Sequence, residues 1–138
     1  MSSSTNHPNS VSFEHFQEGF AIRFSMEWSE SFPVFQINQT KISTNKLIFS
    51  SNKLILPQST LEALAEYMLN GDPLLNIHRL EFKDLYRSYM IIFHGRTQLI
   101  LKTFNLLNEK MEELHLTNLN RDDFYRFLIF DPTSNETP

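Results

Sequence analysis

The chain has 138 residues, 41% hydrophobic composition, thirteen phenylalanines and a formal net charge of −4. This length suits one domain with its own apolar core, and the composition is typical of a globular protein. The chain has no cysteine, which excludes disulfides, thiol nucleophiles and cysteine-ligated metal sites. The acidic balance disfavours nucleic acid as a partner, because phosphate contacts require a basic surface.

Both ends of the chain are polar and contain proline, so they cannot offset the entropy of becoming ordered. We predict a disordered tail at residues 1–12, a single globular domain at residues 13–130 and a disordered tail at residues 131–138. The start of the chain has neither the apolar block of a secretory signal nor the arginines of an organelle presequence. The longest apolar cluster is far too short to span a bilayer. These patterns predict a soluble, intracellular protein, cytoplasmic or nuclear, without a membrane partner.

The first predicted strand is an alternation of apolar and polar residues that follows Gly19. Residues 34–37 can return as a second strand, with Pro33 at its start or on a sheet edge. A helical reading of residues 13–20 is an alternative that the glycine disfavours. We therefore expect an amino-terminal hairpin. The residues on its apolar face are Phe20, Ile22, Phe24, Met26 and Trp28.

The clearest predicted helix follows Pro57. Ser59 and Glu62 have the spacing of a capping box, in which the serine accepts from free amides and the glutamate reaches back. Apolar residues then recur at spacings of three and four over residues 61–69, as expected for one face of a helix. The sequence Asn70-Gly71-Asp72-Pro73 should end the helix, because proline cannot continue it.

The middle of the chain is harder to divide into elements. Residues 85–93 are apolar almost throughout, which favours a buried helix over residues 86–93 that ends at Gly95. Residues 97–107 fit a helix or a strand equally well, so both remain open.

A last helix is predicted near the carboxyl end. Asn120 or Asp122 is a candidate N-cap, and acidic residues in the first turn suit the helix dipole. Phe124, Phe127 and Leu128 form one apolar stripe.

Three short apolar runs recur at intervals of 33 and 34 residues: Leu47-Ile48-Phe49, Leu80-Glu81-Phe82 and Leu114-His115-Leu116. A constant period in this range is typical of stacked strand–helix units. The predicted fold is therefore α/β or α+β, with an N-terminal hairpin followed by about three degenerate leucine-rich-repeat-like units. An ordinary α/β or α+β domain without a true repeat is the alternative.

The candidate binding residues follow from these runs. Because side chains alternate along a strand, the residues between and after the inward-facing anchors should face outward. They would line one sheet surface of mixed charge, which suits a protein ligand. The predicted partner-binding residues are Ile48, Ser50, Glu81, Lys83, His115 and Thr117.

No pattern of catalytic or metal-binding residues is found. Three glycines provide no phosphate-binding loop, and no two of the five histidines have the spacing of a zinc motif. The adjacent carboxylates Glu112-Glu113 and Asp122-Asp123 would diverge on a strand or helix, whereas acid–base catalysis needs convergence. We predict no enzymatic activity, no catalytic or metal residues and no cofactor.

Several of these features occur in an order that resembles a known family. They are Leu47 to Ser51, the helix at 61–69, Asn70 to Pro73, Leu80 to Phe82 and His94-Gly95. The succession resembles the F-box-associated domains abundant in nematodes, over roughly residues 20–130 and without the F-box itself. The resemblance implies a domain that recruits a protein substrate to a ubiquitin ligase and catalyses nothing itself.

Three functions are compatible with these observations. The first is a protein–protein interaction module with a protein ligand, which the resemblance would make a substrate receptor of a ubiquitin ligase. The second is a structural subunit of a multiprotein or homo-oligomeric assembly, because residues 85–107 are unusually apolar. The third is weak RNA binding through the basic segment at 77–110, with Tyr86, Tyr89 and Phe93 as stacking residues. The oligomeric state is left open.

Overall fold

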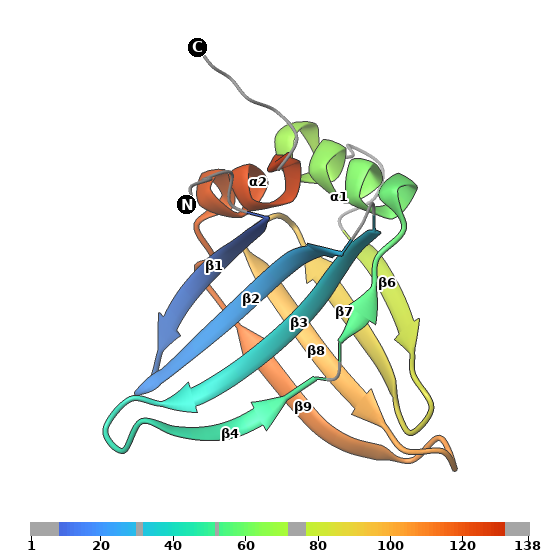
Figure 1. Ribbon diagram of the computed structural model, residues 1–138. Helices are drawn as coiled ribbons and strands as arrows, with labels where there is room; N and C mark the ends of the chain where they lie inside the picture. The colour runs from blue at the N-terminus through green and yellow to red at the C-terminus, as the bar shows by residue number, and fades with distance from the viewer. Residues whose placement is uncertain (1–8, 30–31, 52, 72–76, 132–138) are drawn as a thin grey trace, which may run out of the picture.

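Two antiparallel β-sheets and two helices make up the computed structural model (Figure 1). It describes residues 9–29, 32–51, 53–71 and 77–131. The strands are β1 Ser10–Gln17, β2 Phe20–Ser29, β3 Phe32–Lys41, β4 Lys46–Ser50, β5 Leu54–Ile55, β6 Ile77–Lys83, β7 Ser88–His94, β8 Gln98–Phe104 and β9 Lys110–Leu116; the helices are α1 Gln58–Asn70 and α2 Arg121–Ile129. The first sheet has the order β1-β2-β3-β4, with β5 pairing β3, and the second has the order β6-β7-β8-β9.

The predicted α/β or α+β fold of leucine-rich-repeat-like strand–helix units is wrong, because the described chain is mostly antiparallel strands that form two sheets in a sandwich-like arrangement. Leu47 lies in β4, Leu80 in β6 and Leu114 in β9, so the three regularly spaced anchors fall on non-equivalent strands of two sheets. What recurs is a larger unit, an antiparallel sheet followed by a helix: β1 to β4 with the short β5 and then α1 in residues 10–70, and β6 to β9 and then α2 in residues 77–129. The spacing of the leucines therefore does not mark a solenoid.

The amino-terminal hairpin is confirmed, and it has an additional strand in front of it. β2 pairs with β3 in register from Phe20 opposite Lys41. β1 begins at Ser10, within the segment predicted as a tail, and pairs with β2 over its whole length. The two strands are joined by Glu18 and Gly19, which have φ angles of 52° and 85°. Two consecutive positive φ values define the type I′ turn that matches the twist of a hairpin.

The predicted helix over residues 86–93 is wrong, and the same residues form most of β7. β7 lies between β6 and β8, and buried apolar residues occur on both of its faces. Ile91 faces the core, while Ile92 points to the outer face and is still only 7% exposed. A strand with two apolar faces has no period of two, which made it look like a buried helix. The undecided residues 97–107 contain β8, so the strand alternative holds there.

Helix α1 is confirmed, but its predicted capping box is wrong. The helix begins two residues earlier than the capping box predicts, with Pro57 rather than Ser59 at the N-cap and no side-chain cap bond from any residue of the described chain. Its end is as predicted: Gly71 has a φ of 69°, and its N–H donates to the carbonyl of Tyr67 over 2.8 Å. The following Asp72-Pro73 lies outside the described residues.

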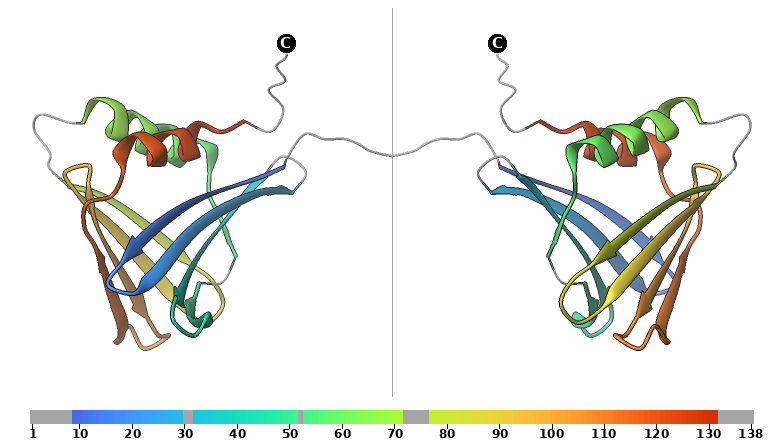
Figure 2. Two further views of the ribbon diagram at one scale, coloured as in Figure 1. Left: turned by 90° about the vertical axis from the view of Figure 1, so that its left-hand side faces the viewer. Right: turned by 90° about the vertical axis from the view of Figure 1, so that its right-hand side faces the viewer.

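Helix α2 is also confirmed, with Asn120 rather than Asp122 as its N-cap. The side-chain oxygen of Asn120 accepts a hydrogen bond from the N–H of Asp123 over 3.1 Å. Both helices lie across the same end of the two sheets (Figure 2). The ring of Phe124 in α2 lies 5.5 Å from that of Phe24 in the first sheet and 5.6 Å from that of Phe93 in the second. The core therefore joins α2 to both sheets.

The contact between α1 and β6 includes a half-buried histidine. The ring of His78 stacks on that of Tyr67 with centroids 5.1 Å apart, and the Tyr67 hydroxyl donates to the carbonyl of Gly95. Burial lowers the pKa of His78 below its ordinary value of 6.5. The folded protein therefore favours the neutral form of the His78 imidazole.

We expect this histidine to make the fold sensitive to mild acid. Below pH 6.5 the unfolded chain binds a proton at His78 more readily than the folded protein does, so the free energy of unfolding falls as the pH drops. Urea unfolding at pH 7 and pH 5 should show a smaller loss of stability for His78→Phe, which keeps the stacking, than for the unaltered protein. Equal losses for both proteins would contradict this prediction.

Candidate functional site

The edges of the two sheets approach each other at two places, which we call margins. At the first margin, a glutamine side chain connects the sheets. The Nε2 of Gln17 in β1 donates to the carbonyl of His115 in β9 over 2.9 Å. Its Oε1 accepts from the N–H of Thr117, also over 2.9 Å. The side-chain amide therefore pairs with β9 as a backbone peptide group of a neighbouring strand would.

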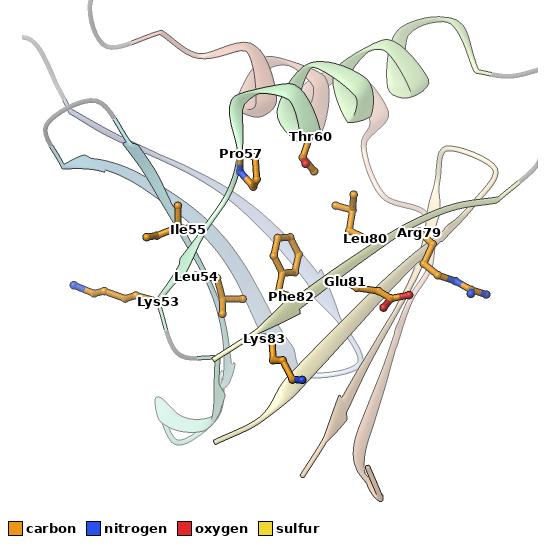
Figure 3. A pocket seen from close by; sticks show the side chains of 10 residues that line it. All are labelled: Lys53, Leu54, Ile55, Pro57, Thr60, Arg79, Leu80, Glu81, Phe82 and Lys83. Carbon is orange, nitrogen blue, oxygen red and sulfur yellow. The ribbon is translucent and has the colours of Figure 1, made fainter. Parts of the chain in front are cut away.

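The second margin, between β5 and β6, is open. Among the described strands, β6 pairs only with β7, and β5 pairs only with β3. A cavity of about 530 Å³ lies between these two edge strands and below the start of α1 (Figure 3). We call this cavity and its walls the edge groove. Its lining residues are Lys53, Leu54, Ile55, Pro57, Thr60, Arg79, Leu80, Glu81, Phe82 and Lys83.

The floor of the edge groove is apolar and fixed in place. Leu54 and Leu80 are buried. The ring of Phe82 stacks on that of Phe35 in β3, with centroids 6.0 Å apart and 26° between the planes. Figure 3 shows Leu80 and Phe82 on one side of β6 and Arg79 on the other. Because Phe82 bridges the two sheets, the floor is preformed.

The backbone of β6 presents hydrogen-bonding groups to the groove. The N–H of Asp84 donates to the carbonyl of Arg87 over 3.0 Å, which makes these two residues a hydrogen-bonded pair of the β6–β7 hairpin. Such pairs alternate along an antiparallel ladder, so in the observed register the N–H and C=O groups of Arg79, Glu81 and Lys83 point away from β7. No strand of the described chain pairs with this edge.

The rim of the groove is mostly basic. Lys53, Arg79 and Lys83 line it together with one acidic residue, Glu81. The nearest ion-pair partner of Lys53 is Glu27, at 4.0 Å and exposed to solvent. No ion pair within the described residues involves the other three rim residues. The rim can therefore pair with charges that a ligand brings.

The structure does not bring the six predicted binding residues onto one surface. Glu81 and Lys83 lie at the edge groove. Ile48 and Ser50 belong to β4 in the other sheet, where a register shift opposite Gln39 and Thr40 leaves both Leu47 and Ile48 exposed. The remaining two, His115 and Thr117, lie at the margin that Gln17 closes. The register aligns Arg79 with Ile92, Ile100 and His115 across the second sheet, so His115 shares the outer face of that sheet with Glu81 and Lys83, at its opposite edge. The six residues therefore divide between two sheets.

His115 faces away from the core, as its alternation with buried neighbours predicted, and takes part in an exposed ion cluster. Its Nε2 contacts the carboxylate of Glu113, and the Nζ of Lys110 lies 2.9 Å from the same carboxylate. The hydrogen bonds from Lys110 and then His115 lower the pKa of Glu113 to about 2. In the described part of the chain no group of three metal-ligating side chains occurs. The cluster is thus a surface ion network, which contributes little stability.

Sequence reasoning missed half of the groove. Arg79 has the same spacing of two residues as Glu81 and Lys83, so the outer face of β6 contained a signal for it. Leu54 and Ile55 form a strand of only two residues before a proline, which is too short for a periodicity to be detected. Pairing of β5 with β3 brings this segment opposite β6.

The aromatic residues proposed for RNA stacking do not form a platform. Tyr89 and Phe93 are 2% and 1% exposed and belong to the core, whereas Tyr86 lies exposed in the turn before β7. Single-stranded nucleic acid needs several exposed rings on one basic surface. The aromatic residues therefore do not support an RNA-binding surface, and the edge groove is the stronger candidate for the functional site.

Comparison with known proteins gives no family for this chain: no family model matches it, and no curated protein matches its sequence. Within the described residues, neither helix combines the length and the apolar character needed to cross a membrane.

Proposed function

We propose that this protein is a protein-interaction module that binds an extended segment of a partner as an added strand on β6. The observation that supports this most strongly is the unpaired edge of β6 above a preformed apolar floor. Strand addition uses main-chain hydrogen bonds for affinity and pockets for alternate side chains for specificity. The edge groove provides both kinds of contact.

The chemistry of the groove indicates what sequence the partner segment has. Side chains of an added strand point alternately to the two faces of the sheet. One set would enter the cavity and contact Leu54 and Phe82, so it should be apolar. The other set would pass Arg79 and Lys83 at the rim, so it should be acidic. The expected ligand is therefore an extended segment in which apolar and acidic residues alternate.

Two further functions remain predictions. Recruitment of the partner to a ubiquitin ligase rests on the resemblance to F-box-associated domains, and ligase subunits among proteins captured with the tagged chain would support it. A role as a structural subunit would be supported by a stable homo-oligomer in light scattering. Neither prediction alters the chemistry of the edge groove.

Hydrogen exchange with a bound peptide is the experiment that tests the proposal. Peptides selected against the protein from a displayed random library should be enriched in alternating apolar and acidic residues. Binding should slow the exchange of the Arg79, Glu81 and Lys83 amides, which the free edge exposes to solvent. The Leu80 and Phe82 amides already pair with β7 and serve as controls within the same strand.

The pattern of protection decides between strand addition and other modes of binding. Slower exchange at alternate residues of β6 alone supports an added strand, because only every second amide faces the groove. Protection confined to the outer face of β8 and β9, or a selected peptide that binds as a helix, would contradict the proposal.

A further inference from the structure

Exposed apolar side chains gather at the end of the molecule opposite the helices. Of the twelve large apolar side chains that are exposed among the described residues, eight lie in the β3–β4, β6–β7 and β8–β9 hairpins. Figures 1 and 2 show the turns of these hairpins at the same end. We call residues 41–48, 84–87 and 104–111 the three-hairpin end. Its exposed apolar residues are Ile42, Leu47, Ile48, Leu85, Tyr86, Leu106, Leu107 and Met111.

The side chains at the two most apolar turns are exposed to an unusual degree. Leu85 is 81% exposed and Leu107 is 79% exposed. Single exposed leucines are common on protein surfaces, but a concentration of them at one end marks an interaction site. The turns carry them away from the core, so core packing does not explain their presence.

Several backbone amides of these two turns are hydrogen-bonded within the turn. The Oδ1 of Asp84 accepts from the N–H groups of Tyr86 and Arg87, both over 2.7 Å. The Oδ1 of Asn105 accepts from the N–H groups of Leu107 and Glu109, both over 2.9 Å. The transfer of an amide out of water costs less free energy when the amide already has a hydrogen-bond partner. These four amides therefore need no hydrogen bond from water.

The three-hairpin end is locally basic on an acidic protein. It contains four cationic and two acidic side chains, whereas the whole chain has a formal net charge of −4. Both acidic side chains accept hydrogen bonds inside their turns. The four cations are Lys41, Lys46, Arg87 and Lys110, of which Lys110 is paired with the neighbouring Glu113 over 2.9 Å. Apolar turns flanked by basic residues are complementary to a surface that has an anionic outer layer over an apolar interior.

We propose that the three-hairpin end docks onto the surface of an anionic membrane, with its leucine and tyrosine side chains at the level of the lipid headgroups. Three separate turns at one end can contact a flat surface together, and fluid lipid accommodates each turn without a matching pocket. A protein partner would need three complementary pockets at fixed spacing. Tyrosine is also favoured at the boundary between water and lipid. This inference differs from the sequence-based expectation of no membrane partner, and it is independent of the edge groove.

Sedimentation with lipid vesicles tests this proposal. The protein should sediment with vesicles of phosphatidylcholine and phosphatidylserine, and less with phosphatidylcholine alone. The double substitution Leu106→Asn with Leu107→Asn should reduce vesicle binding about tenfold or more, because two apolar side chains lose their burial in lipid. The matched control is Leu69→Asn with Ile129→Asn, two side chains that are 51% and 50% exposed on the helices at the opposite end. It should leave vesicle binding unchanged.

Two outcomes would overturn the proposal. The first is no sedimentation of the unaltered protein with either vesicle, or an equal loss for both double variants. The second is a homodimer in light scattering that Leu106→Asn with Leu107→Asn abolishes, because this end would then bind a second copy of the chain. Circular dichroism of each variant confirms that it is folded, so a loss of binding reports the surface itself.

Discussion

Phe124→Ala should destabilise the protein more than any other single truncation in the core, by about 3–5 kcal/mol. The Phe124 ring is 1% exposed. Its centroid lies 5.0 Å from that of Phe13 and 5.5 Å from that of Phe24 in the first sheet, and 5.6 Å from that of Phe93 in the second. Removing it leaves a cavity where both sheets and α2 meet, and the three aromatic partners lose their contacts with this ring. Thermal unfolding should show a midpoint lower by about 10–20 °C.

Two further variants keep this prediction testable if Phe124→Ala does not fold. Phe124→Leu retains most of the buried volume and should cost about 1–2 kcal/mol. Ile129→Ala changes an exposed residue of the same helix and should change the stability by less than about 0.5 kcal/mol. A loss below about 1 kcal/mol for Phe124→Ala would show that the two sheets do not depend on this ring.

The elements that the sequence predicts well are those with one buried face. β2 alternates through Phe24 and Met26, and α1 repeats apolar residues at helical spacing, so each has a clear period. β7 has no clear period because an apolar residue on its outer face, Ile92, is buried as well. β1 was missed because its first residues have the polar composition of a tail and only Phe13 is buried, although two-residue turns such as Glu18-Gly19 join strands.

The arrangement of the elements could not be predicted, because it depends on pairing between distant segments. The leucine spacing suggested a solenoid, yet no local feature of the sequence indicates that β4 and β6 belong to different sheets. Half of the edge groove comes from β5, which has only two residues. The glutamine that closes the other margin, Gln17, bonds to residues about a hundred positions away. Sequence periodicity contains no information on such contacts.

Reversal of two rim charges should weaken the binding of an acidic peptide at the edge groove by about 1–3 kcal/mol, because each reversal replaces an attraction by a repulsion of similar size. The variant is Arg79→Glu with Lys83→Glu, and the loss corresponds to a factor of about 5–150 in Kd. Both side chains are exposed and without described ion pairs, so the unfolding midpoint should stay nearly unchanged. Most of the effect should appear in the association rate and diminish at high salt.

The control for this prediction is Lys41→Glu with Lys46→Glu, which changes the net charge by the same amount. These two lysines lie on the β3–β4 hairpin and do not line the edge groove. Their reversal should leave the peptide affinity within about twofold while it lowers binding to vesicles that contain phosphatidylserine. Glu81→Lys provides the opposite test, because removal of the one acidic rim residue should strengthen peptide binding. Equal losses of peptide affinity in both double variants would show that net charge, not the groove, governs binding.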